Sequence, residues 1–181
     1  DLGADLAVAL HTEAELHQRL QEGAREIEAD YGDTPPLLVG VLKGAVMVMA
    51  DLSRALRFQA QMDWMAVSSY GAGTKSSGVV RILKDLDADI MGRDVLIVED
   101  IIDSGLTLSW LKENLENRGA KSVRICTMLR KPDALKVEVD VAYVGYDIPN
   151  EFVVGYGLDY AENYRNLRDV AILAPHVYSG E

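Results

Sequence analysis

A run of aliphatic residues that ends in a short turn and continues directly into an amphipathic helix occurs twice in this chain. This pattern restricts the fold more than any other feature of the sequence. The runs span residues 37–42 and 95–98, and apolar side chains follow at helical spacing in residues 45–56 and 108–115. A short, continuously apolar run is typical of a strand that is covered on both faces. Repeated strand–turn–helix units therefore predict an α/β chain with a mainly parallel sheet flanked by helices.

Further elements follow from local signals. Thr12 and Glu15 have the spacing of a capping box, which predicts a helix from there to about Asp30. The glycine-rich residues 71–78 are expected to be the exposed, flexible tip of a hairpin. Further strands are expected at residues 62–69, 79–83, 123–129, 139–144 and 170–173.

Composition limits the class of protein. The 181 residues contain no low-complexity linker, which indicates one domain, residues 1–181. The net charge of −11 argues against a nucleic-acid-binding surface, because such surfaces gather Lys and Arg. No apolar run approaches 18 residues, and the only cysteine, Cys126, is expected to be a small buried side chain in a strand. A cytoplasmic protein that does not span a membrane is expected.

The side chains that can carry chemistry are concentrated in the loop expected after the second aliphatic run, residues 99–107. Glu99 and Asp100 come first, and residues 103–107 then lead into a helix. Gly105 allows a tight turn, and the backbone N–H groups there, with the hydroxyls of Ser104 and Thr107, would hold a monophosphate at the helix N-terminus. The adjacent carboxylates suit hydroxyl donors better than phosphate, which indicates a phosphorylated sugar as the ligand.

Residues 95–107 resemble the phosphoribosyl diphosphate motif of the hypoxanthine-guanine phosphoribosyltransferases. Four further segments match that family in order, and the resemblance covers roughly residues 16–173; these segments are residues 41–44, 69–71, 129–132 and 152–160 followed by Arg165. The resemblance implies the type I phosphoribosyltransferase fold. It also implies a flexible lid hairpin and a small hood formed by about residues 1–15 and 145–181.

The resemblance assigns roles within the motif. Glu99 and Asp100 would bind the ribose hydroxyls, and Asp103 would be the catalytic base at N7 of the purine. The 5-phosphate would lie in the turn made by Ser104, Gly105, Leu106 and Thr107. Leu106 is apolar where some relatives have a polar or basic residue, but little loss is expected because backbone amides do most of the binding.

The diphosphate leaving group is assigned to other segments. The resemblance implies that it contacts Leu42, Lys43, Gly44, Ser69, Tyr70 and Arg165. An unusual peptide geometry is expected in the first of these segments, and the lid carrying Tyr70 would exclude water. Magnesium is the implied cofactor, with Glu99, Asp100 and Asp159 as the metal-binding residues.

Recognition of the base is assigned to Lys131, Phe152, Val153 and Asp159. Phe152 would stack on the purine, and backbone groups near Val153 and Asp159 would contact its N1 and N2 edge. Lys131 would donate to O6, which favours hypoxanthine and guanine over adenine. Arg130 is an alternative donor. The implied reaction converts these bases and phosphoribosyl diphosphate into IMP or GMP, with release of diphosphate.

Two other functions stay open at this stage. One is a phosphoribosyltransferase-like regulator that senses nucleotides and binds RNA, and the other is the same type of enzyme acting on another base such as xanthine. The three histidines, His11, His17 and His176, are expected to lie at the surface. A homodimer or homotetramer is implied by the resemblance.

Overall fold

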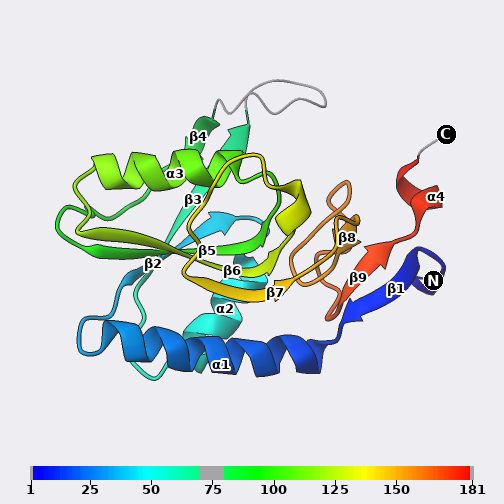
Figure 1. Cartoon of the computed structure of the whole chain (residues 1–181), viewed down its shortest axis with the longest axis horizontal. Coiled ribbons are helices and arrows are strands. Elements are labelled where there is room, and N and C mark those ends of the chain that lie inside the picture. The colour runs from blue at the N-terminus through cyan, green and yellow to red at the C-terminus, as the bar shows by residue number, and fades with distance from the viewer. Residues whose placement is uncertain (1, 70–79, 180–181) are drawn as a thin grey trace.

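The computed structural model describes residues 2–69 and 80–179, which form two sheets and their covering helices (Figure 1). The larger sheet contains β2 (Leu37–Leu42), β3 (Met62–Ser69), β4 (Val80–Lys84), β5 (Asp94–Ile102), β6 (Ser122–Arg130) and β7 (Tyr143–Asp147). The smaller sheet contains β1 (Leu6–His11), β8 (Val153–Val154) and β9 (Val170–Leu173). The helices are η1 (Leu2–Ala4), α1 (Glu13–Tyr31), α2 (Val46–Ala55), α3 (Leu106–Asn117), η2 (Pro132–Ala134) and α4 (Pro175–Tyr178).

The larger sheet has the strand order β4-β3-β2-β5-β6-β7. All neighbours are parallel except β3 and β4, which form an antiparallel hairpin. The predicted mainly parallel sheet is therefore confirmed. The predicted tip of the hairpin, residues 71–78, lies outside the described residues.

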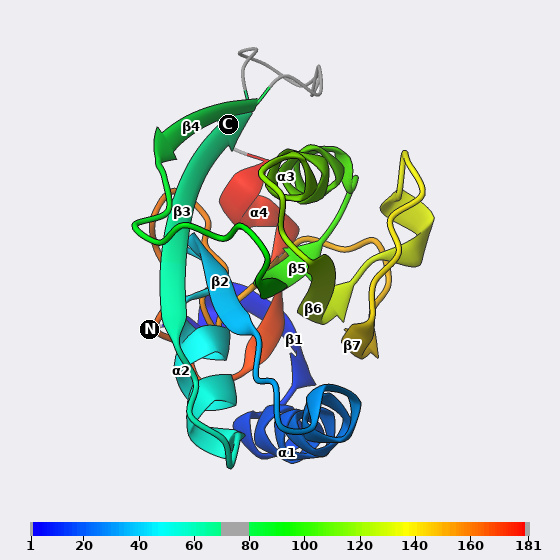
Figure 2. The ribbon, with the colours of Figure 1, turned by 90° about the vertical axis from the view of Figure 1, so that its left-hand side faces the viewer.

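The helices divide between the two faces of this sheet, as the two views show (Figures 1 and 2). Helices α1 and α2 cover one face, and the core on that side contains Leu16, Ile27, Met49 and Leu96. Helix α3 covers the other face, where Leu111 and Leu115 pack on Ile97 and Ile125. Each core is formed by the apolar side chains whose regular spacing in the sequence predicted the helices and strands.

Helix α1 begins at the predicted capping box. The Thr12 hydroxyl accepts a hydrogen bond from the Glu15 N–H (3.2 Å), and the Thr12 N–H donates to the Glu15 carboxylate (2.9 Å). Two of the unpaired N–H groups at the helix N-terminus are satisfied in this way. The helix ends at Tyr31, one residue beyond the predicted end.

The smaller sheet joins the two ends of the described chain. Strand β9 pairs antiparallel with β1 on one side and β8 on the other. This sheet, with α4, stands beside the carboxyl end of the larger sheet in Figure 1. It corresponds to the hood that the resemblance implied.

Two expected boundaries are wrong. The strand expected at residues 139–144 begins only at Tyr143, because Val139 and Val141 pack against the core on the α3 side instead of pairing with β6. Strand β5 also extends to Ile102, because Ile101 and Ile102 pair with β6. Glu99 and Asp100 are therefore the end of a strand and not part of a loop.

The order of the strands places a topological switch point between β2 and β5. The chain leaves β2 for α2 on one face and leaves β5 for α3 on the other, so the connections diverge at this pair. Such a switch point is where open α/β sheets bind ligands, beyond the carboxyl ends of the strands. Here those ends carry Lys43 and Gly44 after β2, and Glu99 and Asp100 in β5.

Candidate functional site

The last residues of β5 lie at this switch point. Pairing of β5 with β2 stops at Gly40 and Val98, whereas pairing with β6 continues to Ile102. The edge of Glu99 and Asp100 that faces β2 is therefore free of sheet hydrogen bonds within this ladder. Consecutive strand residues point to opposite faces, and it is Asp100 whose carboxylate lies against Gly44 in the loop after β2.

The two carboxylates have raised pKa values. Burial raises the pKa of Glu99 well above its ordinary range, and the neighbouring Asp100 adds to the effect. Burial also raises the pKa of Asp100 to about 6, although hydrogen bonds from backbone N–H groups and the charge of Arg165 oppose it. Adjacent desolvated carboxylates gain from hydroxyl donors or a cation, and these are the groups that a sugar and magnesium would supply.

The turn formed by residues 103–107, which was expected to hold the phosphate, has the local geometry that the sequence predicted. Gly105 adopts a φ of 81°, and the Ser104 hydroxyl accepts a hydrogen bond from the Leu106 N–H (3.3 Å). A Cβ on Gly105 would lie 2.9 Å from a methyl group of Val139, so glycine is required here for space as well as for conformation. Helix α3 begins at Leu106, so its N-terminus, where backbone N–H groups favour anions, lies at the end of β5.

The loop after β2 lies directly against Asp100. The peptide bond between Leu42 and Lys43 is cis, which agrees with the unusual geometry expected there. A Cβ on Gly44 would lie 2.0 Å from the Asp100 carboxylate. Likewise, a Cβ on Gly157 would lie 2.2 Å from the Gly44 carbonyl oxygen, and Gly157 has a φ of 99°. Asp100, Gly44 and Gly157 thus pack in three successive layers that leave no room for side chains on either glycine.

Arg165 lies beside the same loop. Its guanidinium donates to the Gly157 carbonyl (2.8 Å) and to the Glu162 carboxylate (2.6 Å), and it is 3.6 Å from Asp159. The Lys43 ammonium pairs with the other oxygen of the same Glu162 carboxylate. Hydrogen bonds from Lys43 and then Arg165 lower the pKa of Glu162 to about 2. The two cations assigned to diphosphate are therefore neighbours, and Glu162 bridges them.

Lys131, which was assigned to the purine O6, is a neighbour of Asp103, the expected catalytic base. The Lys131 side chain is 9% exposed, and its Nζ lies 3.5 Å from an oxygen of Asp103, whose side chain is 59% exposed. Arg130, the alternative donor, forms two hydrogen bonds with the Asp147 carboxylate instead (2.7 and 3.0 Å). Of these two cations, Lys131 is thus the one that lies beside Asp103.

Phe152 is in contact with two tyrosines. Its ring is stacked on Tyr178 of α4, with centroids 4.9 Å apart, and meets the edge of Tyr160. Tyr178 therefore covers one face of the Phe152 ring. Val153 is buried in β8, where it pairs with Ile172.

The remaining residues considered in the sequence are two lid residues, the three histidines and the cysteine. Tyr70 and the side chain of Ser69 lie outside the described residues. His17 and His176 are exposed as expected, but His11 is half-buried and stacks on Tyr146 with centroids 4.0 Å apart. Cys126 lies in β6 as expected, half-buried, and burial raises the pKa of its thiol to about 12.

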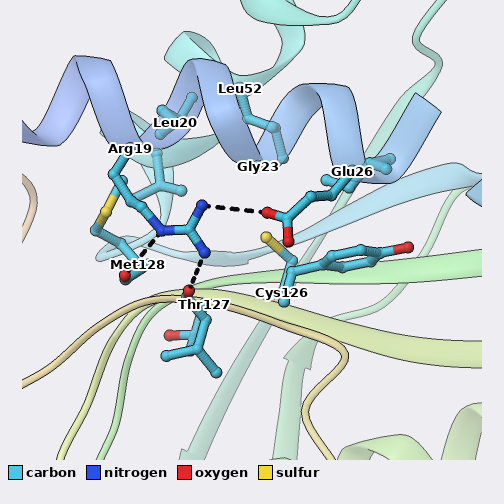
Figure 3. A pocket seen from close by; sticks show the side chains of 13 residues that line it. Arg19, Leu20, Gly23, Glu26, Leu52, Cys126, Thr127 and Met128 are labelled. Carbon is cyan, nitrogen blue, oxygen red and sulfur yellow. Dashed lines mark hydrogen bonds and ion pairs between the residues drawn. The ribbon is translucent and has the colours of Figure 1, made fainter. Parts of the chain in front are cut away.

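A small cavity lies elsewhere, between α1, α2 and the strands β6 and β7 (Figure 3). Arg19 closes it by donating to the carbonyls of Val144 and Gly145 (2.9 and 3.0 Å) and to Glu26 (3.1 Å). Its walls are mostly apolar and include Cys126. The residues expected to bind substrates are absent from its lining, so this cavity is separate from the candidate site.

Comparison with known proteins identifies the family. A family model described as the phosphoribosyl transferase domain matches residues 9–161. The hypoxanthine-guanine phosphoribosyltransferase of Mycobacterium avium is 57% identical over 180 residues, which cover 96% of this chain and 89% of that protein. The chain belongs to the hypoxanthine-guanine phosphoribosyltransferase family.

Two further members of the family extend over almost the whole chain. The hypoxanthine-guanine phosphoribosyltransferase of Bacillus subtilis is 51% identical over 174 residues, covering 96% of this chain and 97% of that protein. A crystal structure of a hypoxanthine phosphoribosyltransferase from Staphylococcus aureus has a TM-score of 0.96 and 44% identity, covering 99% of this chain and 97% of that one. The type I phosphoribosyltransferase fold and the enzyme class inferred from the motifs are confirmed.

The sequence analysis did not single out Glu162, Gly157 or Tyr178. Glu162 lies three residues before Arg165 in a polar stretch, which is a weak signal that a carboxylate shares the arginine. Gly157 and Tyr178 act through contacts with Gly44 and Phe152, and these partners are distant in the sequence. No local pattern marks such pairs.

Proposed function

We propose that this enzyme transfers the 5-phosphoribosyl group of phosphoribosyl diphosphate to N9 of hypoxanthine or guanine, which gives IMP or GMP and diphosphate. The observation that carries this assignment is the pair formed by Lys131 and Asp103, whose charged atoms are 3.5 Å apart. O6 and N7 are adjacent on one edge of a 6-oxopurine. A donor for O6 beside an acceptor for the N7 proton matches that edge.

The same pair accounts for selectivity against adenine. Adenine presents an amino group where a 6-oxopurine presents O6, so the buried Lys131 ammonium would face another donor. The Lys131 ammonium has three donors and no acceptor, so it cannot form a hydrogen bond with the amino group of adenine as the donor. Sites that leave a buried polar group unpaired reject the wrong substrate strongly.

The residues around the sugar have complementary tasks. The turn from Ser104 to Thr107 binds the 5-phosphate, and Glu99 and Asp100 accept hydrogen bonds from the ribose hydroxyls. As diphosphate departs, positive charge develops on the ribose ring, and these carboxylates stabilise it. Lys43 and Arg165 bind the departing diphosphate, and Asp103 takes the N7 proton while N9 attacks the anomeric carbon.

Magnesium fits this site as a cofactor shared with the substrate. Among residues 2–69 and 80–179, no cluster of three or more His, Cys, Asp and Glu side chains is arranged to hold a metal. Mg²⁺ commonly uses one or two carboxylates together with substrate phosphate oxygens and water. Glu99 and Asp100 would supply such carboxylates, and Asp159, 3.6 Å from Arg165, would be a further metal-binding residue. The bound ion would neutralise charge on the diphosphate.

An absorbance assay with phosphoribosyl diphosphate and Mg²⁺ tests the function. We expect nucleotide formation with hypoxanthine and guanine and none with adenine. Nucleotide formation from xanthine alone would instead indicate an enzyme specific for another base. Tight RNA binding without turnover of any base would indicate the nucleotide-sensing regulator considered above.

A pair of variants tests the assignment of Lys131. Lys131→Ala should narrow the preference for 6-oxopurines over adenine by at least tenfold in kcat/KM, because the donor at O6 is lost. Arg130→Ala is the matched control, since Arg130 is paired with Asp147, and its preference should be unchanged. Equal discrimination in the two variants would assign the O6 contact to another group.

The assembly and its location are part of the proposal. In the described part of the chain, no helix is long and apolar enough to cross a membrane. We place the enzyme in the cytoplasm as a homodimer or homotetramer, as the resemblance implies. Light scattering of the purified protein measures the assembly, and a monomer would contradict it.

A further inference from the structure

The loop that carries Arg165 contains a tight turn with unusual residues. Tyr160 and Asn163 exchange two backbone hydrogen bonds (3.1 and 3.0 Å), which closes a two-residue hairpin. Its central residues, Ala161 and Glu162, have φ values of 51° and 66°. Turns with positive φ at both central positions strongly favour Asn-Gly, because other side chains are strained there. Such a turn persists only when contacts outside it hold it in place.

The Glu162 carboxylate makes those outside contacts. One oxygen pairs with the Lys43 ammonium, and the other accepts a hydrogen bond from the Arg165 guanidinium (2.6 Å). The Glu162 N–H donates to the Asp159 carboxylate (3.0 Å). The Glu162 side chain is 56% exposed, so this carboxylate reaches the two cations from the solvent side and is not enclosed by the core.

The partners of Glu162 are the cations that the proposed function assigns to diphosphate. A carboxylate whose two oxygens bind an ammonium and a guanidinium makes the same kind of charge-assisted hydrogen bonds as the oxygens of diphosphate. Glu162 and diphosphate therefore compete for Lys43 and Arg165. Diphosphate can displace Glu162, because the ion pairs of Glu162 are partly exposed to solvent and individually weak.

We propose that Glu162 is an internal substitute for diphosphate, which pairs Lys43 and Arg165 between turnovers and releases them when phosphoribosyl diphosphate binds. This inference rests on the assignment of those two cations to diphosphate. Glu162 is a positioning residue, since it acts through the cations and not on the reacting atoms. Its return to the cations as diphosphate leaves weakens product binding, so it favours release.

The test is diphosphate binding to enzymes that lack this carboxylate. E162Q removes the charge and keeps the size, and E162G removes the side chain but tolerates positive φ. Both should bind inorganic diphosphate three- to tenfold more tightly with Mg²⁺ present, measured by calorimetry and by product inhibition. The factor is about the combined strength of two exposed ion pairs. The KM for hypoxanthine should stay the same.

Two controls make the result specific. E116Q changes the net charge equally but affects an exposed pair with Lys112 on α3, and its diphosphate affinity should equal that of the parent. In a Lys43→Ala background, E162Q should tighten diphosphate binding by a smaller factor, because one of the two released cations is missing.

The possible failures are distinct. If diphosphate binds no more tightly to E162Q and E162G than to the parent, the proposal is overturned, even when the parent converts hypoxanthine into IMP. If diphosphate binds more weakly to both, Glu162 only organises the cations, and the proposal is equally overturned. If the parent forms no nucleotide from any purine, the proposed function itself fails.

Discussion

The close contact between Gly44 and Asp100 allows a quantitative prediction about the proposed sugar site. An alanine Cβ at residue 44 would lie 2.0 Å from one carboxylate oxygen of Asp100 and 2.8 Å from its Cγ. Non-bonded heavy atoms settle about 3.5 Å apart, so the carboxylate or the loop has to move by about 1.5 Å. Misplacement of a substrate-binding group by roughly 1 Å can cost about 100-fold in rate.

We therefore expect Gly44→Ala to lower kcat/KM for phosphoribosyl diphosphate about 100-fold, measured with saturating hypoxanthine. Overpacking should also destabilise the fold by about 1–3 kcal/mol, which thermal unfolding would measure. Gly23→Ala is the matched control. Gly23 lies within α1 and a Cβ there meets nothing within 4 Å, so this variant should keep its activity and gain about 0.5–1 kcal/mol of stability.

A double substitution separates the steric cause from a general loss of structure. In an Asp100→Ala background, the group that Gly44→Ala would displace is gone. Adding Gly44→Ala there should cost much less than 100-fold, since substitutions at contacting residues are not additive. A Gly44→Ala enzyme that keeps more than a third of the parental kcat/KM would refute the steric argument.

Three further predictions concern other contacts. Asp103→Asn should reduce kcat by at least 100-fold while the KM for phosphoribosyl diphosphate changes less than threefold, and steady-state kinetics that show equal turnover would remove Asp103 as the base. Tyr178→Ala removes the ring stacked on Phe152, so the KM for hypoxanthine should change at least threefold with the KM for phosphoribosyl diphosphate constant; unchanged values for both would show that α4 does not influence the base site. Hydrogen bonds from Arg130 hold the pKa of Asp147 below its ordinary range, so the pair stabilises the fold above the unfolded-state pKa and loses this contribution as the pH falls through the folded-state pKa. The Tm difference between the parent and Asp147→Ala should thus be larger at pH 7 than at pH 3, and a difference independent of pH would contradict this.

The larger sheet could be predicted from the sequence because its signals are local. Strands β2 and β5 are continuous aliphatic runs, and the helices after them have apolar residues at regular spacing. Residues 139–142 misled the analysis, since Val139 and Val141 are apolar for packing and not for sheet pairing. Hydrophobicity alone does not distinguish these two uses.

The smaller sheet was less accessible to prediction. Strand β8 has only two residues, and β1 exposes Val8 by 55%, so neither has a clear strand pattern. Their pairing with β9 joins residues that are far apart along the chain. Only the resemblance to a family indicated a hood.

The candidate site divides in the same way. The turn around Gly105 and the carboxylates before it are consecutive in the sequence, so one motif revealed them. The layers formed by Asp100, Gly44 and Gly157 come from three segments, and the bridge from Glu162 to Lys43 spans 119 positions. Such contacts depend on how the loops meet in space, and no spacing rule encodes them.

The pairing of β1 with β9 also has a consequence for synthesis on the ribosome. Leu6 pairs with Leu173 and His11 with Val170, so the smaller sheet cannot close until almost all of the described chain has left the exit tunnel. The strands of the larger sheet are complete by Asp147, well before that point. A nascent chain can therefore assemble the turn before α3 and the core on the α3 side first, whereas the core on the α1 and α2 side also needs Val153, Tyr156 and Val170. Arg165 and Phe152, which we propose to bind diphosphate and the purine, are then positioned late in synthesis.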